Sequence, residues 1–385
     1  MTTKINNEHK KLNVPNLRFP EFQGEWEEST IGEMFDLYSG NTPSRLNKEH
    51  FKGTVNWISS GELKEHYIYS SKEQISEEAA KGLKLLPVGT FVIAIYGLEA
   101  EGVRGTGSII QESSTISQAC MSFIPKGVIE NEFLFSWYKK HGNVIGIRYA
   151  QGTKQQNLSY DILEKFRIAY PNTKEQEKLN KFISLLDERI TTQNKIIDKL
   201  QSLIKGIRND VFGKLRKNIG FNAVVGDVLD YEQPQSYIVE DTEYTNEGTP
   251  VLTANKAFVL GYTLETVGIY DKGDCIIFDD FTLDCKYVDF PFKVKSSAIK
   301  ILTAKNKELL RYTFEFLKYL DLSTEEHKRH YIAETQNQEL ILPNEQMVKT
   351  IAHIFSTLSL RMETAVKQRG IFEKQKQYLL RQMFV

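Results

Sequence analysis

One internal repeat constrains this chain more than any other feature of its sequence. Apolar residues recur in alternating steps of four and three between Leu179 and Val211, over more than four heptads. This spacing predicts a helix about 48 Å long at about 1.5 Å per residue, with a narrow apolar seam that needs a partner helix. The seam positions are Leu179, Ile183, Leu186, Ile190, Gln193, Ile197, Leu200, Ile204, Ile207 and Val211.

The sequence places the partner helix in the same chain. When the sequence is shifted by 172 residues, positions 343–384 align with 171–212 without a gap, and both segments begin with Pro-Asn and end with Phe. Two unrelated long helices are the alternative interpretation, which the aligned identities disfavour. Gln193, Arg369 and Lys376 interrupt the seams, so we expect them to set the register of the pair. The second seam comprises Ile351, Phe355, Leu358, Met362, Ala365, Arg369, Phe372, Lys376, Leu379 and Met383.

The order of the smaller predicted elements is duplicated as well. The first half contains one amphipathic element at 26–38, a helix at 132–140, and strands at 55–59, 90–96, 119–124 and 166–170. The second half contains a helix at 309–320 and strands at 273–278, 298–302 and 339–342. We therefore expect an α+β chain with two globular modules that share a layout. Their polar loops differ, as two binding modules of different specificity require.

Composition sets outer limits on the kind of protein. A chain of 385 residues with 41% hydrophobic and 26% charged residues is long enough for two or three soluble domains. Its polar start predicts no secretory signal, and the lack of 18 consecutive apolar residues predicts no membrane span. Three cysteines without a C-x-x-C pair favour a reduced, cytoplasmic location without disulfides.

Charge is uneven along the chain although the formal net charge is only −1. A basic stripe at the end of the first long helix could contact phosphates, and a solvated helix face is the alternative interpretation. The stripe comprises Lys195, Lys199, Lys205, Arg208, Lys214, Arg216 and Lys217, with Asp198 and Asp210 among them.

Several motifs that would indicate catalysis fail on their spacing. The glycine-rich stretch 97–107 lacks the Lys-Ser/Thr of a P-loop and the G-x-G-x-x-G of a dinucleotide site, so a recognition loop or a plain turn is expected. His327 and His330, beside Glu325 and Glu326, lack a third metal ligand. The chain has no Pro-Pro step, so it lacks the Asn/Asp-Pro-Pro-Tyr/Phe signature of amino-methylating DNA methyltransferases. We therefore predict that this chain alone performs no chemistry and binds no metal.

The whole arrangement resembles the specificity subunit of type I restriction–modification enzymes over residues 17–385. The likeness lies in the polar segment 152–158, in 171–176 with 182–190, and in the degenerate second copy 343–346 with 354–362. Segments 41–44, 115–120, 250–256 and 278–282 resemble strings found in target recognition domains. Two departures stand out: 329–337 matches 152–158 poorly, and Ser359-Leu360 replace Asp187-Glu188.

The resemblance implies a fold and a division of the chain. It implies two α/β target recognition domains separated by two long helices that pack as an antiparallel coiled-coil spacer, with an internal pseudo-twofold repeat. The expected divisions are a flexible leader at 1–16, the first domain at 17–170, the central helix at 171–217, the second domain at 218–342 and the C-terminal helix at 343–385.

The resemblance also implies partners. Each domain would read one half of a bipartite double-stranded DNA target, and the stiff helices would fix the distance between the half-sites. The helices would dock two methyltransferase (modification) subunits, and restriction subunits, which act as endonuclease and translocase, would join them. No cofactor is expected on this chain, since S-adenosylmethionine, ATP and Mg²⁺ would belong to the partner subunits.

Polar loop residues are the expected base readers, because Arg and Lys suit guanine and Asn and Gln suit adenine. Lys214, Arg216 and Lys217 are better placed for phosphates. Two other hypotheses remain open: a stand-alone metal-dependent nuclease using Asp279, Asp280, Asp284 and Lys286, and a scaffold that does not bind DNA. The candidate DNA-binding residues are Thr42, Ser44, Arg45, Ser59, Ser60, Arg104 and Lys154 in the first module, and Thr253, Asn255, Lys256, Thr282, Lys286 and Arg329 in the second.

Overall fold

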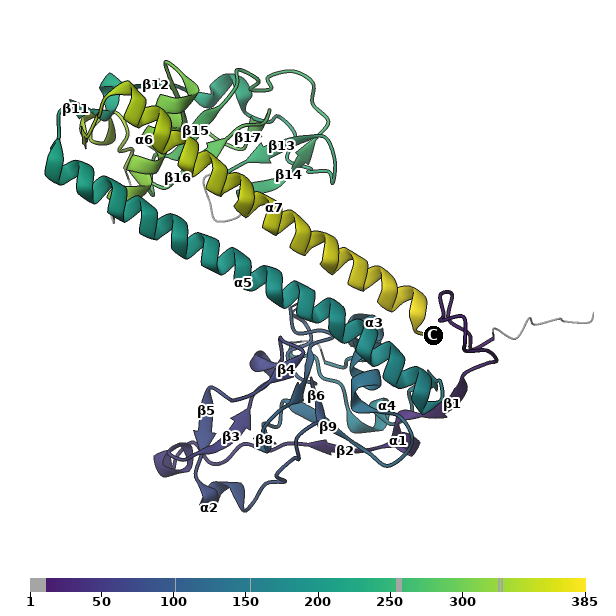
Figure 1. Ribbon diagram of the computed structural model, residues 1–385. Coiled ribbons are helices and arrows are strands. Elements are labelled where there is room, and N and C mark those ends of the chain that lie inside the picture. Colours follow the sequence, from purple (N-terminus) through teal and green to yellow (C-terminus); the bar gives the residue numbers. More distant parts are fainter. Residues whose placement is uncertain (1–11, 101, 153, 254–257, 325, 327) are drawn as a thin grey trace, which may run out of the picture. The chain divides into compact units, whose positions relative to one another are not determined.

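The computed structural model describes residues 12–100, 102–152, 154–253, 258–324, 326 and 328–385 (Figure 1). The chain divides into two compact units. Unit 1 comprises 1–192 with 369–385, and unit 2 comprises 193–368. Each unit therefore contains one recognition module and a segment of each of the two long helices, α5 (Thr173–Asn218) and α7 (Glu345–Met383).

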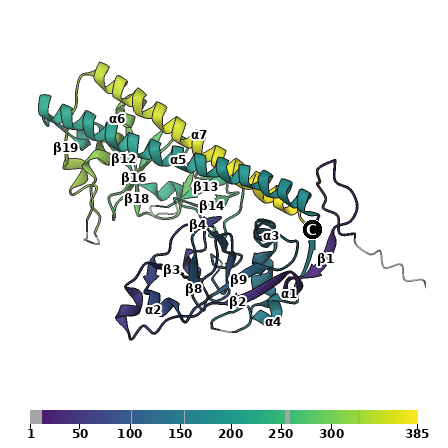
Figure 2. The ribbon, with the colours of Figure 1, turned by 60° about the horizontal axis from the view of Figure 1, so that its bottom comes forward.

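The two long helices confirm the repeat found in the sequence. The Asn172 side chain accepts a hydrogen bond from the Glu175 amide at 3.1 Å, and the Asn344 side chain accepts one from the Met347 amide at 2.9 Å. The same residue type thus caps both helices at equivalent positions. In unit 1 the start of α5 packs with the end of α7, and in unit 2 the end of α5 packs with the start of α7, so the pairing is antiparallel (Figures 1 and 2).

The predicted seam residues form these contacts. Leu179, Ile183 and Leu186 share a core cluster with Leu379 and Met383 in unit 1. The rest of the predicted seam is buried or half-buried, namely Ile190, Gln193, Ile197, Leu200, Ile204, Ile207, Val211, Ile351, Phe355, Leu358, Met362, Ala365, Arg369, Phe372 and Lys376. Lys376, which interrupts the second seam, forms an ion pair with Asp187 on the facing helix.

Module 1 is built on a five-stranded sheet. Its strand order is β2-β9-β6-β7-β4, and β4 joins the edge parallel to β7 whereas the other neighbours are antiparallel. Helix α3 (Asn131–Tyr149) packs on this sheet, and its apolar residues join those of α5 in one core. The strands are β2 (Phe35–Ser39), β9 (Cys120–Pro125), β6 (Phe91–Ala94), β7 (Gly107–Ile110) and β4 (Tyr67–Ile68).

Two smaller sheets complete module 1. One pairs the first strand of the module with the last, just before α5, and the other has β3 at its centre. The former contains β1 (Glu27–Thr30) and β10 (Arg167–Tyr170), and the latter contains β5 (Glu73–Ile75), β3 (Val55–Ile58) and β8 (Ser114–Ile116). The short helices are α1 (Ile31–Met34), η1 (Lys48–Phe51), η2 (Ser60–Glu62), α2 (Glu77–Ala80) and α4 (Tyr160–Leu163).

Module 2 repeats this topology with one difference. Its main sheet has the order β12-β18-β15-β16 and ends at β16, without a counterpart of β4 among the described residues. Its strands are β11 (Ala223–Val224), β12 (Leu229–Glu232), β13 (Thr249–Leu252), β14 (Val259–Thr263), β15 (Cys275–Asp279), β16 (Cys285–Val288), β17 (Lys293–Val294), β18 (Ile299–Ala304) and β19 (Glu339–Leu340). Its helices are η3 (Val225–Asp227), η4 (Pro234–Tyr237), α6 (Lys307–Leu320) and η5 (Thr335–Asn337).

Two expectations about local structure were wrong. The predicted element at 26–38 is three elements, β1, α1 and β2, because the Thr30 hydroxyl caps α1 at the Glu33 amide and separates the two strands. The helix predicted at 132–140 continues to Tyr149, because Gly142 and Gly146 do not end it. A Cβ at Gly142 would lie 2.8 Å from the Cα of Gly105, so these glycines allow the β6–β7 loop to pack closely on α3.

Candidate nucleic-acid interface

In module 1, a hydrogen bond from a β3 side chain to the main chain holds the loop after β2 against β3. The Trp57 indole N–H donates to the carbonyl of Asn41 at 3.0 Å, and the Asn41 side chain accepts from the Thr42 amide at 2.8 Å. The Ser44 carbonyl lies 3.2 Å from Nδ1 of His50. Thr42 is half-buried and Ser44 is exposed, so the loop presents Ser44 and the residues that follow it to solvent.

The Arg45 side chain of this loop is held in place by one carboxylate and two aromatic rings. Its guanidinium donates to both carboxylate oxygens of Glu73, at 2.9 and 2.8 Å, and lies 4.5 Å from the ring centroid of Phe51 and 5.5 Å from that of Trp57. The side chain is still 57% exposed. The hydrogen bonds from Arg45 lower the pKa of Glu73. A planar, exposed guanidinium in a fixed orientation is the group that reads guanine in the major groove.

A second polar group lies where β3 ends. The Ser59 amide and hydroxyl both donate to Glu62, at 2.9 and 2.8 Å, and the other oxygen of Glu62 accepts from the Lys72 amide at 2.6 Å. Ser60 begins η2 and is half-buried. Sequence reasoning missed Glu62 and Glu73, which orient Ser59 and Arg45. Glu73 lies 28 positions from Arg45, and Glu62 contacts Ser59 across η2, so no sequence pattern marks either contact.

Arg104 and Lys154 lie apart from the Arg45 loop, in loops that adjoin α3. Arg104 is half-buried, with its aliphatic stem against Gly146 and its Nη2 3.4 Å from the carbonyl of Glu99. It therefore braces the β6–β7 loop. Lys154 is exposed in the segment after α3, where Glu99 also accepts a hydrogen bond from the Gln156 amide at 2.9 Å.

In module 2, Arg329 lies near one buried carboxylate, that of Asp280. The guanidinium of Arg329 lies 3.7 Å from Asp280, donates to the Ser297 hydroxyl at 3.2 Å and lies 5.7 Å from the Phe281 ring. Asp280 is 1% exposed and also lies 3.2 Å from the buried ammonium of Lys300. The Arg329 side chain is 47% exposed, so it is an oriented cation at the module surface.

The other candidates of module 2 are less favourably placed. Thr253 is buried, and the ammonium of Lys286 lies 3.5 Å from Asp284 and 5.5 Å from the Phe258 ring. The Thr282 hydroxyl is used inside its turn, where it donates to Asp279 at 2.7 Å. Asn255 and Lys256 lie outside the described residues.

The acidic residues of the nuclease hypothesis serve the fold. Asp279 accepts hydrogen bonds from the amides of Phe281 and Thr282, and Asp280 accepts them from the amides of His330 and Tyr331. Within the described ranges, no three His, Cys, Asp or Glu side chains are grouped as metal ligands. Glu325 and His327 lie outside those ranges.

The end of α5 carries the predicted phosphate-binding residues at its surface. Lys214 pairs with Asp210 at 2.7 Å, and the Arg216 guanidinium lies 5.3 Å from the Phe221 ring. Lys214, Arg216 and Lys217 are all exposed. These cations therefore remain accessible to a negatively charged partner.

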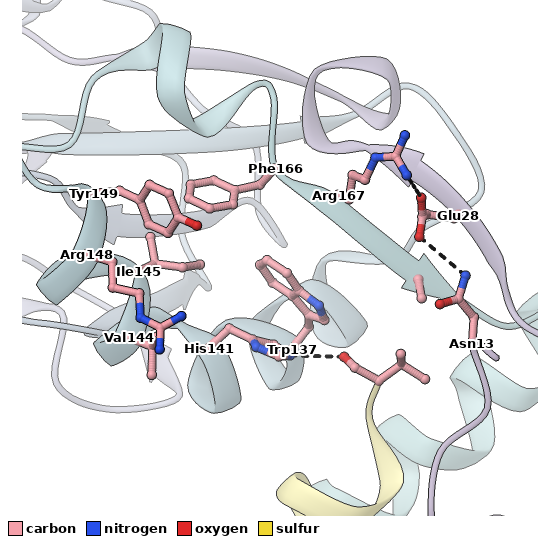
Figure 3. Close-up of a pocket in the computed structure, with 12 residues that line it drawn as sticks. Asn13, Glu28, Trp137, His141, Val144, Ile145, Arg148, Tyr149, Phe166 and Arg167 are labelled. Atoms are coloured by element: carbon pink, nitrogen blue, oxygen red, sulfur yellow. Dashed lines mark hydrogen bonds and ion pairs between the residues drawn. The ribbon is translucent and has the colours of Figure 1, made fainter. Parts of the chain in front are cut away.

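A cavity of about 280 Å³ lies at the other end of module 1, where α3 meets the end of the chain (Figure 3). His141 on α3 donates from Nε2 to the carbonyl of Val385 at 3.0 Å, and Trp137 and Arg148 line the same cavity. Across it, Arg167 pairs with Glu28 at 2.5 Å. The His141 contact holds the end of the chain on module 1, which makes this a structural feature rather than a reading surface.

Each module is also anchored to the long helices by a buried ionic network. In unit 1 the His66 imidazole lies between Asp187 and Glu132, at 3.1 and 2.8 Å. In unit 2 the Glu315 carboxylate accepts from Arg208 on α5, at 2.7 and 2.9 Å, and from Arg311 at 2.8 Å. The networks use different residues, so each module is matched to its own segment of the helix pair.

Known proteins are similar in sequence to parts of this chain. Residues 23–202 match a family model described as the type I restriction modification DNA specificity domain. Over 126 residues the chain is 45% identical to the specificity subunit of the type I restriction enzyme EcoR124I/EcoR124II from Escherichia coli, with 31% of each protein covered. It is 26% identical over 222 residues to the MjaIX specificity subunit from Methanocaldococcus jannaschii, covering 56% of this chain and 50% of that protein. The alignments thus span half or less of the curated relatives' length.

Solved structures share the fold over nearly the whole chain. The S subunit of a type I restriction–modification system from M. genitalium superposes with a TM-score of 0.67 at 16% identity, covering 97% of this chain and 99% of that one. A structure described as the basis of complex assembly and conformational transition of the type I R-M system gives 0.52 at 13% identity, covering 92% and 96%. None of the helices within the described ranges is both long and apolar enough to cross a membrane.

Proposed function

The chain belongs to the type I restriction–modification DNA specificity family, and from this premise we propose that it is the DNA-recognition subunit of such a complex. Each module would read one half of a bipartite target in double-stranded DNA. One observation carries the proposal most directly. The two modules share a sheet topology and anchor to the same pair of helices, while their oriented surface cations, Arg45 and Arg329, sit in unrelated loops.

The long helices support a role as spacer and docking surface for two modification subunits. Several apolar side chains on them remain exposed to solvent although their seams are filled, and exposed apolar side chains on a helix face favour protein partners. These residues are Leu185, Ile196 and Leu203 on α5 and Ile354, Leu360, Val366, Ile371 and Tyr378 on α7. Restriction subunits would join the assembled complex.

The chain itself would not be catalytic. The chemistry of methylation and cleavage, with S-adenosylmethionine, ATP and Mg²⁺, would lie on the partner subunits. Support comes from Asp279, Asp280 and Asp284, whose carboxylates are occupied by main-chain amides and lysines of the same module.

Co-purification followed by a methylation assay tests this function. The modification subunits encoded with this chain should co-purify with it, and the complex should methylate a discontinuous sequence that the modification subunits alone do not methylate. DNA cleavage by the purified chain alone with Mg²⁺, abolished by Asp280→Ala and retained by a fold-matched Asp289→Ala control, would instead establish the nuclease hypothesis.

A further inference from the structure

The outer edge of the main sheet is closed in unit 1. Strand β4 lies parallel to β7, and the amides of Ile109 and Gln111 donate to the carbonyls of His66 and Ile68, each at 2.8 Å. A sheet edge without such a neighbour presents open hydrogen-bonding groups to another chain. In module 1 these groups are satisfied internally.

His66, which precedes β4, joins this edge to α3 and α5. His66 stacks on Phe135 of α3 with ring centroids 4.0 Å apart. Its two nitrogens face the carboxylates of Glu132 on α3 and Asp187 on α5. Two carboxylates thus surround a basic ring beside this edge of unit 1.

The equivalent edge of unit 2 lacks this neighbour in the part of the chain that the structure describes. Strand β16 is the last strand of its sheet, and no strand within the described ranges pairs with its outer edge. The connection between β13 and β14 covers only 253–258, whereas the connection that contains β4 in module 1 covers 59–72. A cavity of about 640 Å³, which we call the β16 groove, lies beside Tyr287 of β16, Arg311 and Lys318 of α6, and Ser359 of α7.

The β16 groove differs in charge from unit 1 at one position of the repeat. Ser359 stands where the first copy has Asp187. The groove is lined by both signs of charge, and its Lys307 and Lys318 already pair with Asp274 and Asp284. Arg311 is 7% exposed and its Nη2 donates to Glu315 and Ser359. Its Nε has no hydrogen-bond partner among the residues that the structure describes. A buried guanidinium with an unused donor favours an incoming anion.

We propose that the β16 groove receives an extended segment of a partner subunit, which pairs with the outer edge of β16 and places a carboxylate side chain at Arg311 and Ser359. Addition of a strand to an open sheet edge is an established mode of protein recognition, in which side-chain pockets give the specificity. The partner would supply in unit 2 what β4 and His66 supply in unit 1. This inference rests on the proposed function, because it requires an assembled complex.

Hydrogen–deuterium exchange on the full-length chain tests the strand pairing. Lys286 and Val288 pair with Ile277 and Cys275 of β15, so of these three amides that of Tyr287 points to the outer edge. In the isolated chain, the Tyr287 amide should exchange faster than those of Ile109 and Gln111 in β7. On assembly with the modification and restriction subunits encoded with it, the Tyr287 amide should be protected at least about tenfold. Unchanged exchange in an assembled complex overturns the inference and leaves the proposed function standing. Failure to form any complex contradicts both.

A charge variant tests the carboxylate. Ser359→Glu places a carboxylate beside Arg311 within the chain, so it should weaken assembly at least about tenfold. The control Ser323→Glu makes the same change on an exposed loop of module 2 and should leave assembly unchanged. Equal affinities for both variants overturn the inference. Protection of the Tyr287 amide by duplex DNA alone, without partner subunits, also overturns it, because phosphate would then be the anion.

Discussion

Nδ1 of His66 lies 3.1 Å from a carboxylate oxygen of Asp187, and this contact joins the edge of the module 1 sheet to helix α5. Burial opposes the charge of the imidazole, but hydrogen bonds to Asp187 and Glu132 outweigh it and raise the pKa of His66. Burial likewise opposes the Asp187 charge, yet His66 and Lys376 lower the pKa of Asp187. The charged form of the cluster is therefore the stable one.

Replacing His66 should destabilise unit 1 in a pH-dependent way. Because the folded pKa of His66 is raised, its stabilising contribution is complete below the unfolded value of about 6.5 and is lost as pH rises through the folded pKa. His66→Gln should cost about 1.5–3 kcal/mol near pH 6, as expected for hydrogen bonds to a charged group. The difference in Tm from the unaltered protein should narrow at higher pH. A constant difference, or an equal loss in the exposed His353→Gln control, contradicts this prediction.

The Glu315 network predicts a larger effect in unit 2. Glu315 is 1% exposed and its carboxylate faces both Arg208 and Arg311. Glu315→Gln leaves two buried or half-buried guanidinium groups without a counter-charge, which should lower the free energy of unfolding by about 3–5 kcal/mol. Urea unfolding measures it, with Glu363→Gln on the exposed face of α7 as a control that should change stability by less than about 0.5 kcal/mol. Equal effects of the two variants would refute the buried network.

Arg45 should contribute to specific DNA binding by module 1. Arg45→Ala should weaken binding to the cognate target by about 1–3 kcal/mol and relax preference at one half-site only. Arg45→Lys should also lose specificity, because an ammonium cannot engage Glu73 in a bidentate way. Arg167→Ala serves as control, because Arg167 is 77% exposed but lies on β10 and pairs with Glu28. Competition binding to randomised duplexes measures all three variants, and loss at both half-sites would contradict the assignment.

Arg329 should act in the same way on the other half-site. Arg329→Ala removes an oriented guanidinium without disturbing the hydrogen bonds that main-chain amides donate to Asp280, so folding should be preserved. Specific affinity should fall by about 1–3 kcal/mol, with preference relaxed at the half-site that Arg45→Ala leaves intact. The neighbouring Lys328→Ala, which removes a lysine paired with Glu326 and Glu334, is the control. Identical affinities of the two variants would exclude Arg329 as a reader.

The sequence was most informative where a pattern is long and periodic. The heptad seams and the offset of 172 residues predicted both long helices, because these features depend on local spacing. The His66 and Glu315 networks could not be predicted from the sequence. His66 lies 121 positions from Asp187, and Arg208 lies 107 positions from Glu315. No periodic signal marks such contacts.

The candidate interface was predictable in kind but only partly in detail. Polar residue types in loops between strands correctly indicated exposed side chains at Ser44, Arg45 and Arg329. Exposure itself depends on tertiary packing, so the sequence could not foresee that Thr253 is buried or that Arg104 packs on α3. Whether any of these residues contacts DNA stays a prediction.

Exchange of one module tests the central claim most directly. Residues 17–150 are replaced by the corresponding part of another specificity subunit, the complex is expressed with its modification subunits, and the methylated sites are read by methylation-sensitive genome sequencing. The two-reader account predicts that one half of the methylated sequence changes while the other half stays the same. A change in both halves, or in neither, with the complex still active, would contradict it.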